Sequence, residues 1–130
     1  MKRQHDSMIV YVESNFVLEL AFLQEEHEGC LSLLDLAESH AIDLVLPSFS
    51  IGEPYEVWVR RSLSPQDSIV YASILAHLSE APAGPHCFIT KNAKDFLNPD
   101  IENDLTAYTC RLLTKFANGL GYVRSQLSAG

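Results

Sequence analysis

The sequence has little basic charge. Nine Lys and Arg residues stand against seventeen Asp and Glu, which gives a formal net charge of -8 over 130 residues. Such a surface repels nucleic acid at long range, so the basic footprint typical of a nucleic-acid-binding domain is missing. Contact with RNA or DNA would therefore require a local source of positive charge. A divalent cation held by clustered carboxylates is one such source.

Cysteine and long apolar runs are also scarce. The three cysteines, Cys30, Cys87 and Cys110, lie far apart in apolar neighbourhoods. An odd number of scattered cysteines argues against a disulfide framework and favours reduced core residues. Glu19 interrupts the most apolar segment, 16–23, which is too short for a membrane span or a signal peptide. We therefore expect a cytoplasmic protein that does not associate with membranes.

Several familiar catalytic signatures are absent. The sequence contains no Gly-x-Ser-x-Gly nucleophile motif and no phosphate-binding P-loop, and its five histidines share no metal-ligand spacing with one another or with cysteine. The single Gly-x-Gly, at Gly119 and Gly121, has Arg124 where a dinucleotide-binding motif needs its third glycine. We interpret both glycines as structural residues that weaken a helix.

Strand and helix patterns alternate along the chain. The predicted strands are 8–12, 42–46, 86–90 and 108–113. The predicted helices are 14–23, 24–39, 50–61, 64–78 and 115–123. The first of them is nearly all apolar, so we expect it to be buried. Residues 98–103 are expected to form a polar loop. This order predicts an α/β fold: one domain, 1–130, with a central, mostly parallel sheet of about four strands and helices on both faces.

Glu13 is the first candidate for chemistry. It directly follows the apolar run 8–12 and precedes the helix-capping types Ser14 and Asn15. In an open parallel sheet, ligands bind at the carboxyl ends of the strands, where the chain turns into a helix. A carboxylate there is costly unless it is solvated in a crevice or bound to a cation.

Three further acids stand at predicted helix openings or just after a strand: Glu53, Asp67 and Asp95. Taken singly, each fits an ordinary structural role, because an acid in the first turn interacts favourably with the helix macrodipole and a capping residue contributes about 0.5–2 kcal/mol. Together they can converge on Glu13, because several helices begin at the edge where the strands end. A hard cation relieves the repulsion among such carboxylates, and oxygen ligands favour Mg2+ or Mn2+ over zinc.

Four segments resemble, in order, the acidic motifs of PIN-domain ribonucleases, a family that includes the VapC-type toxins of toxin-antitoxin pairs. They are Val-Tyr-Val-Glu-Ser-Asn at 10–15, Leu-Pro-Ser-Phe-Ser-Ile-Gly-Glu at 46–53, Pro-Gln-Asp-Ser-Ile-Val-Tyr-Ala at 65–72 and Phe-Ile-Thr-Lys-Asn-Ala-Lys-Asp-Phe at 88–96. The resemblance implies a PIN-like three-layer α/β/α sandwich that hydrolyses RNA with Mg2+ or Mn2+. It also implies an antitoxin as a protein partner and a homodimer as the assembly.

The resemblance implies a role for each matched residue. Glu13, Glu53, Asp67 and Asp95 match the acids that hold the metal and carry catalysis, and Asn15 and Thr90 match the polar residues that brace them. Asn92 is open to either a bracing or an N-cap role. The basic residues nearest these motifs are candidate RNA phosphate contacts, with a solvated surface role as the alternative; they are Lys91, Lys94, Arg60 and Arg61.

A second hypothesis belongs to another class. In it, the PIN-like fold is a catalytically inactive binding or assembly module. The acidic surface suits this role, as does the span between Glu53 and Asp67, which is shorter than is usual in the family. The two hypotheses differ in whether Mn2+ binds at the acids and whether RNA is cleaved.

Overall fold

The structure is a computed structural model and describes residues 8–47 and 65–129. In these ranges four parallel strands form one sheet in the order β2-β1-β3-β4. They are β1 (Met8–Tyr11), β2 (Ile42–Val45), β3 (His86–Ile89) and β4 (Cys110–Leu113). The predicted α/β class and central parallel sheet are confirmed, although each strand is one or two residues shorter than expected.

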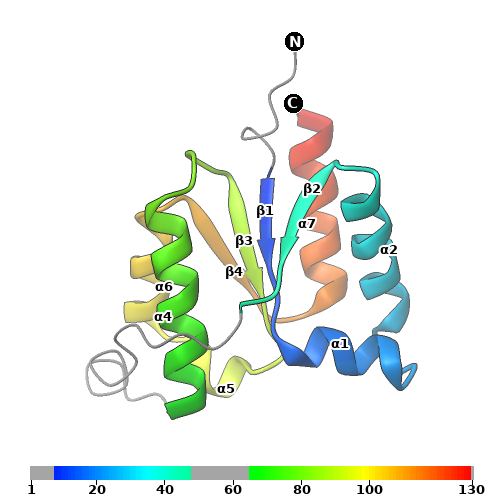
Figure 1. Ribbon diagram of the computed structural model, residues 1–130, viewed down its shortest axis with the longest axis horizontal. Coiled ribbons are helices and arrows are strands. Elements are labelled where there is room, and N and C mark those ends of the chain that lie inside the picture. Colours follow the sequence, from blue (N-terminus) through cyan, green and yellow to red (C-terminus); the bar gives the residue numbers. More distant parts are fainter. Residues whose placement is uncertain (1–7, 48–64, 130) are drawn as a thin grey trace.

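Six helices in the described ranges cover the two faces of this sheet (Figure 1). One face carries α1 (Ser14–Ala21), α2 (His27–Glu38) and α7 (Phe116–Ala129). The other carries α4 (Pro65–Ser79), α5 (Ala93–Phe96) and α6 (Pro99–Thr106). The helix that the sequence predicts over 50–61 lies outside the described residues. The layers are consistent with a three-layer sandwich.

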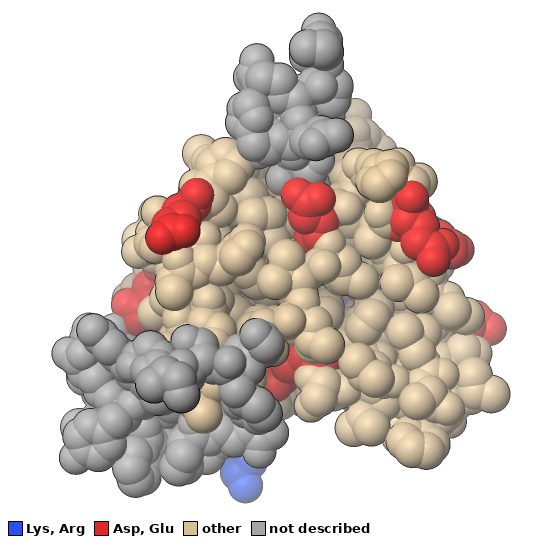
Figure 2. All heavy atoms as spheres, viewed as in Figure 1, with Lys and Arg blue, Asp and Glu red and all other residues tan. Residues whose placement is uncertain are grey.

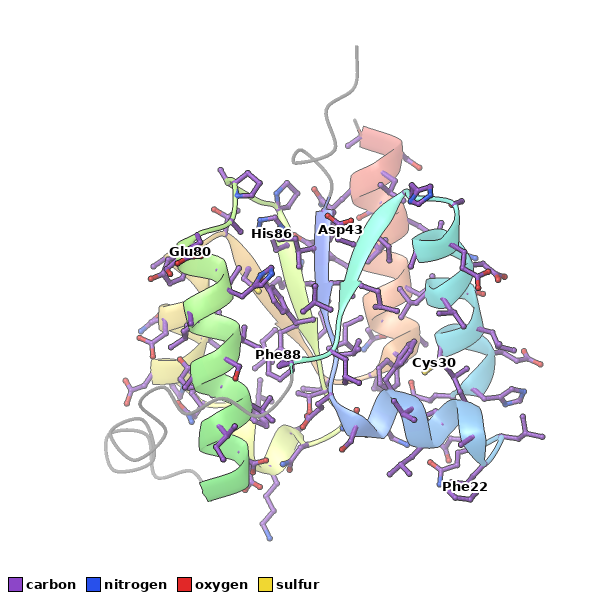
Figure 3. The ribbon with its side chains drawn as sticks, in the orientation of Figure 1. Phe22, Cys30, Asp43, Glu80, His86 and Phe88 are labelled. Atoms are coloured by element: carbon purple, nitrogen blue, oxygen red, sulfur yellow. The ribbon has the colours of Figure 1, made fainter. Side chains whose placement is uncertain are left out.

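The core consists of two clusters, one on each face of the sheet. Successive side chains of a strand point to opposite faces. Val10 of β1 therefore packs with Phe16 and Leu33, while the adjacent Tyr11 packs with Ile74 and the α4 face. Figure 3 shows Cys30 and Phe88 on opposite sides of the sheet, one in each cluster. Because β1 is buried on both faces, it is apolar at every position, as is typical of a central parallel strand.

The connections of β1 and β3 run in opposite directions. The chain leaves β1 toward β2 through α1 and α2, and leaves β3 toward β4 through α5 and α6 (Figure 1). Open α/β sheets bind ligands in the crevice that forms at such a reversal. The register pairs Val10 with Cys87; extended by three positions, it places Glu13 opposite Thr90.

Two predictions about helices are wrong. Residues 98–103 are not a polar loop, because α6 begins at Pro99 and is capped by Asn98, whose Oδ1 accepts from the Ile101 N–H at 3.0 Å. The helix is held by Ile101 and Leu105, which lie one turn apart and are fully buried. The polar residues around them mask this two-residue apolar stripe in the sequence.

The helix over 14–23 is shorter than predicted and is not buried as a whole. Only Phe16 and Glu19 of α1 are buried, whereas Val17 and Leu18 are each 45% exposed. Phe22, at the end of α1, is 68% exposed and projects away from the fold (Figure 3). Several apolar side chains of this helix therefore form part of the exposed surface and not of the core. Within the described ranges, every helix is too short or too polar to cross a membrane.

The glycines of the last helix have different roles. A Cβ built at Gly119 would lie 2.2 Å from Cδ1 of Ile89, so the missing side chain lets α7 approach β3 closely. Gly121 has no neighbouring atom within 4 Å of such a Cβ. Gly119 is thus a packing position, and α7 continues past the predicted end at residue 123 to Ala129.

Candidate functional site

Glu13 lies where β1 turns into α1, at the edge of the sheet where β1 and β3 end. Its extended backbone makes it the N-cap residue of α1, yet its side chain makes no capping hydrogen bond. Glu13 as a whole residue is 9% exposed, and its Oε2 accepts a hydrogen bond from the Thr90 hydroxyl. The Glu13 carboxylate therefore binds Thr90, which follows the neighbouring strand β3, and does not cap its own helix α1.

The surroundings of Glu13 disfavour its charge. Burial raises the pKa of the Glu13 carboxyl, and the negative charges of Asp67 and Asp95 raise it further. Hydrogen bonds from Thr90 and Asn15 lower the pKa and offset part of this rise. The three acids are thus close enough to repel one another, which is the condition under which a bound cation is favourable.

Asn92 joins the two aspartates. Its Nδ2 donates to Oδ2 of Asp95 at 3.0 Å and to Oδ2 of Asp67 at 3.3 Å. Its backbone N–H donates to Oγ1 of Thr90 at 3.0 Å. Asn92 is the N-cap residue of α5, but its side chain makes no capping hydrogen bond, so of the two roles left open it takes the bracing one.

One chain of contacts thus joins Glu13, Thr90, Asn92, Asp67 and Asp95. We call these five residues the carboxylate cluster. They come from the end of β1, the first turn of α4 and the segment that follows β3. In Figure 2 acidic side chains are set into the lower centre of the view, at the edge where the strands of Figure 1 end.

Asn15 lies beside Glu13, and its side-chain hydrogen bond lowers the pKa of that carboxyl. Its Oδ1 is buried and has no hydrogen-bond partner within the described part of the chain. A buried amide oxygen without a donor is unusual and calls for a partner, such as a water molecule or an ion. Asn15 is therefore a polar group that could take part in binding a cation or its hydration shell.

The oxygen atoms of these side chains are the kind of ligand that a hard cation binds, but the described residues place fewer than three such acidic side chains around one ion. Carboxylate and amide oxygens are the ligands that Mg2+ and Mn2+ prefer. Within 8–47 and 65–129, however, no three or more Asp, Glu, His or Cys side chains are arranged to hold one metal ion. Glu53, the fourth predicted ligand, lies outside the described residues, as do Arg60 and Arg61.

The two described lysines near the cluster differ in their surroundings. Lys94 lies on α5 and is exposed. The ammonium group of Lys91 forms an ion pair with Glu19 and lies 4.0 Å from Oε2 of Glu26. A phosphate contact by Lys91 would have to compete with these two carboxylates.

Glu19 is a functional candidate that the sequence alone does not indicate. In the sequence it is a charge that interrupts an apolar segment, whereas in the structure its side chain is completely buried. One feature of the sequence does indicate a partner for Glu19: a single acid on an otherwise apolar helix is costly to bury unless another group pairs with it. Its partner Lys91 is 72 residues away, and no local pattern pairs the two.

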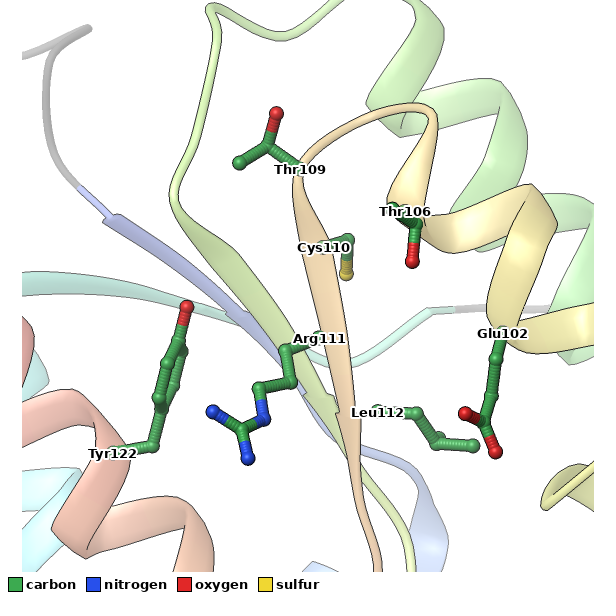
Figure 4. A pocket seen from close by; sticks show the side chains of 7 residues that line it. All are labelled: Glu102, Thr106, Thr109, Cys110, Arg111, Leu112 and Tyr122. Carbon is green, nitrogen blue, oxygen red and sulfur yellow. The ribbon is translucent and has the colours of Figure 1, made fainter.

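A hollow in the described part of the structure lies elsewhere. It measures about 490 Å³ and borders the edge strand β4 between α6 and α7 (Figure 4). The guanidinium of Arg111 stacks there over the Tyr122 ring, 5.1 Å from its centroid. None of the predicted acids lines this hollow, so the chemistry of the carboxylates, and not the cavity size, identifies the candidate site.

The comparisons with known proteins return no relative of this chain: no family model, no curated protein and no solved structure matches it.

Proposed function

We propose that the protein is a metal-dependent ribonuclease that uses Mg2+ or Mn2+ at the carboxylate cluster. The observation that carries this proposal is the convergence of Glu13, Asp67 and Asp95 at the edge of the sheet where β1 and β3 end. Burial and mutual repulsion raise the pKa of the Glu13 carboxyl there. A dication offsets both penalties, and the oxygen-only donor set suits the two metals.

The residues have distinct roles in this proposal. Glu13, Asp67 and Asp95 hold the cation, with Glu53 as the fourth acid. Thr90 fixes the Glu13 carboxylate, and Asn92 fixes the two aspartates through a shared Nδ2. When bound, the cation supplies Lewis-acid polarisation of a phosphodiester and lowers the pKa of a water molecule. With a net charge of -8, the protein needs such a positive centre to attract RNA.

The PIN-like fold and the RNA substrate rest on the resemblance of the four acidic motifs. The parallel sheet, the layers on both of its faces and the position of Glu13 are consistent with that family. The resemblance also suggests an antitoxin or a second copy as a protein partner. Exposed apolar side chains in α1 and directly after it support such a contact: Val17, Leu18, Phe22 and Leu23.

The deciding experiment compares two aspartates. Asp67→Asn removes a proposed ligand while keeping the size of the side chain. Asp43→Asn is the control, because Asp43 is exposed and lies near the start of β2 (Figure 3), whereas Glu13 follows the end of the neighbouring strand β1. We expect Asp67→Asn to reduce Mn2+-dependent cleavage of a single-stranded RNA by more than about 100-fold, since loss of an outer-shell partner alone costs about 10–100-fold. We expect Asp43→Asn to retain activity.

A catalytically inactive binding module is the second candidate. It is favoured by one observation, that no three potential ligands within the described ranges are arranged around one ion. In that case the wild-type protein cleaves no RNA with either metal, and its melting temperature does not change with Mg2+ or Mn2+. Calorimetric titration of the wild-type protein with Mn2+ separates the two functions before any substrate is chosen.

A further inference from the structure

Glu19 is a fully buried carboxylate outside the carboxylate cluster. It lies on α1, and no part of its side chain is exposed. Both of its oxygens are used: Oε2 accepts from the Lys91 ammonium, and Oε1 accepts from the backbone N–H of Glu26 at 2.8 Å. The hydrogen bond from Lys91 lowers the pKa of Glu19, and the same contact raises the pKa of Lys91. The pair is therefore charged.

The contacts extend from this pair to a third element. Oε1 of Glu26 accepts from the backbone N–H of Ala117, in the first turn of α7, at 3.2 Å. The Lys91 ammonium lies 4.0 Å from the other oxygen of Glu26. Lys91 is thus held by Glu19 of α1 and by Glu26, the N-cap residue of α2, and Glu26 in turn binds the start of α7. These three helices lie on one face of the sheet.

The two neighbours of Lys91 in the chain, Thr90 and Asn92, belong to the carboxylate cluster. Thr90 donates to Glu13, and Asn92 donates to Asp67 and Asp95. The three consecutive residues 90–92 therefore connect the anchored lysine to every described acid of the cluster. The backbone N–H of Thr90 is held by the Leu113 carbonyl, and only two peptide bonds separate Thr90 from Asn92. A rotation of the backbone at Lys91 would therefore move the Asn92 N–H away from Thr90 Oγ1, which it holds, and the Asn92 amide away from the two aspartates.

We infer that Glu19 is a positioning residue: by anchoring Lys91 it orients Thr90 and Asn92, and through them the carboxylates of the cluster. The effect on metal affinity rests on the proposed function, whereas the effect on the Glu13 environment does not. Outer partners of this kind typically change metal affinity without touching the ion.

The test measures the Glu13 pKa by NMR titration of its side-chain carboxyl. Glu19→Gln keeps the acceptor for the Glu26 N–H but removes the charge that anchors Lys91. If the Thr90 hydrogen bond is then lost, the Glu13 pKa rises above the wild-type value, because that bond lowers it. Removing a negative charge would by itself move the Glu13 pKa downward, so charge alone cannot cause a rise.

A second variant keeps the net charge of the protein. Glu19→Leu combined with Lys91→Met replaces both members of the pair by apolar side chains, and such replacements often preserve folding. We expect the same upward shift of the Glu13 pKa in this double variant. Glu28→Gln, at an exposed position in the first turn of α2, is the matched control and leaves the Glu13 pKa unchanged.

The outcomes separate positioning from a purely structural role. If the ion pair only stabilises the fold, the melting temperature falls but the Glu13 pKa, measured well below the transition, equals that of the wild type or drops. Either result overturns the inference. If Mn2+ binds to the wild type, we also expect about 10-fold weaker binding in both variants. If the wild type binds no Mn2+, the proposed function fails, and the Glu13 pKa still decides the role of Glu19.

Discussion

Glu13→Gln is expected to stabilise the protein at neutral pH when no metal is present. The Glu13 pKa is raised in the folded state relative to its ordinary value. The folded protein then binds a proton more tightly than the unfolded chain does. Protonated Glu13 therefore makes its full contribution to the unfolding free energy below the ordinary glutamate pKa. This contribution is lost as the pH rises through the folded-state pKa of Glu13. Glutamine carries no charge at any pH and avoids this loss.

The size of the effect follows from linkage. Each unit by which the folded-state pKa exceeds the unfolded value costs the wild type about 1.4 kcal/mol of unfolding free energy at neutral pH. Glutamine has nearly the size of glutamate, and its Oε1 can still accept from Thr90. We therefore expect the variant to exceed the wild type in stability at pH 7 and to match it at about pH 4.

Mn2+ is expected to reverse this order. At a free Mn2+ concentration 100 times its Kd, binding adds about 2.7 kcal/mol to the wild type. Glu13→Gln lacks one proposed metal ligand, so Mn2+ is expected to add little to its unfolding free energy. Urea unfolding followed by circular dichroism, with linear extrapolation at each pH, measures both differences. Glu28→Gln, at an exposed position, serves as the control and is expected to stay within about 0.5 kcal/mol of the wild type throughout.

Two results would refute the reasoning on Glu13. If the wild type without metal is at least as stable as the variant at pH 7, the carboxylate is not held in an unfavourable environment. If the difference between the two proteins does not change with pH, then it arises from packing and not from the Glu13 charge.

Two further predictions concern the fold and its surface. Gly119→Ala places a methyl group against Ile89 and is expected to lower the unfolding free energy by about 1–3 kcal/mol. At Gly121 the new methyl group meets open space, so Gly121→Ala is expected to raise the unfolding free energy by about 0.5–1 kcal/mol. Thermal unfolding of both variants measures the two changes, and equal shifts would contradict the close approach of α7 to β3. Phe22→Ser combined with Leu23→Ser removes two side chains that are 68% and 70% exposed, so we expect unchanged monomer stability but weaker association with a second copy or another protein, measured by analytical ultracentrifugation. A loss of monomer stability would show instead that these side chains support the core.

The order of strands and helices could be predicted because it follows from local patterns. The apolar run that forms β1 identifies a strand buried on both faces, and the acid that follows it marks the ligand-binding edge of the sheet. That Glu13, Asp67 and Asp95 lie at this edge follows from the topology of alternating strands and helices. The bracing role of Asn92 could not be decided, because an asparagine before a short helix equally suits a capping position.

Other features depend on contacts between distant residues. The pairing of Glu19 with Lys91 joins α1 to the segment after β3, and neither residue shows this in its own neighbourhood. The exposure of α1 could not be predicted either. An apolar helix is buried only where another element covers it, and the sequence of the helix does not contain that information. Short helices such as α6 are missed for a similar reason, since two buried residues produce too weak a periodicity.

The hydrogen bond between Thr90 and Glu13 joins residues 77 positions apart and has a consequence for biosynthesis. A ribosome-bound chain that has emerged only as far as β2 contains Glu13 but none of its partners from α4 or the segment after β3. Such a chain therefore contains no assembled carboxylate cluster. Contacts of such long sequence separation also slow folding, because the intervening loop must be closed before the contact can form.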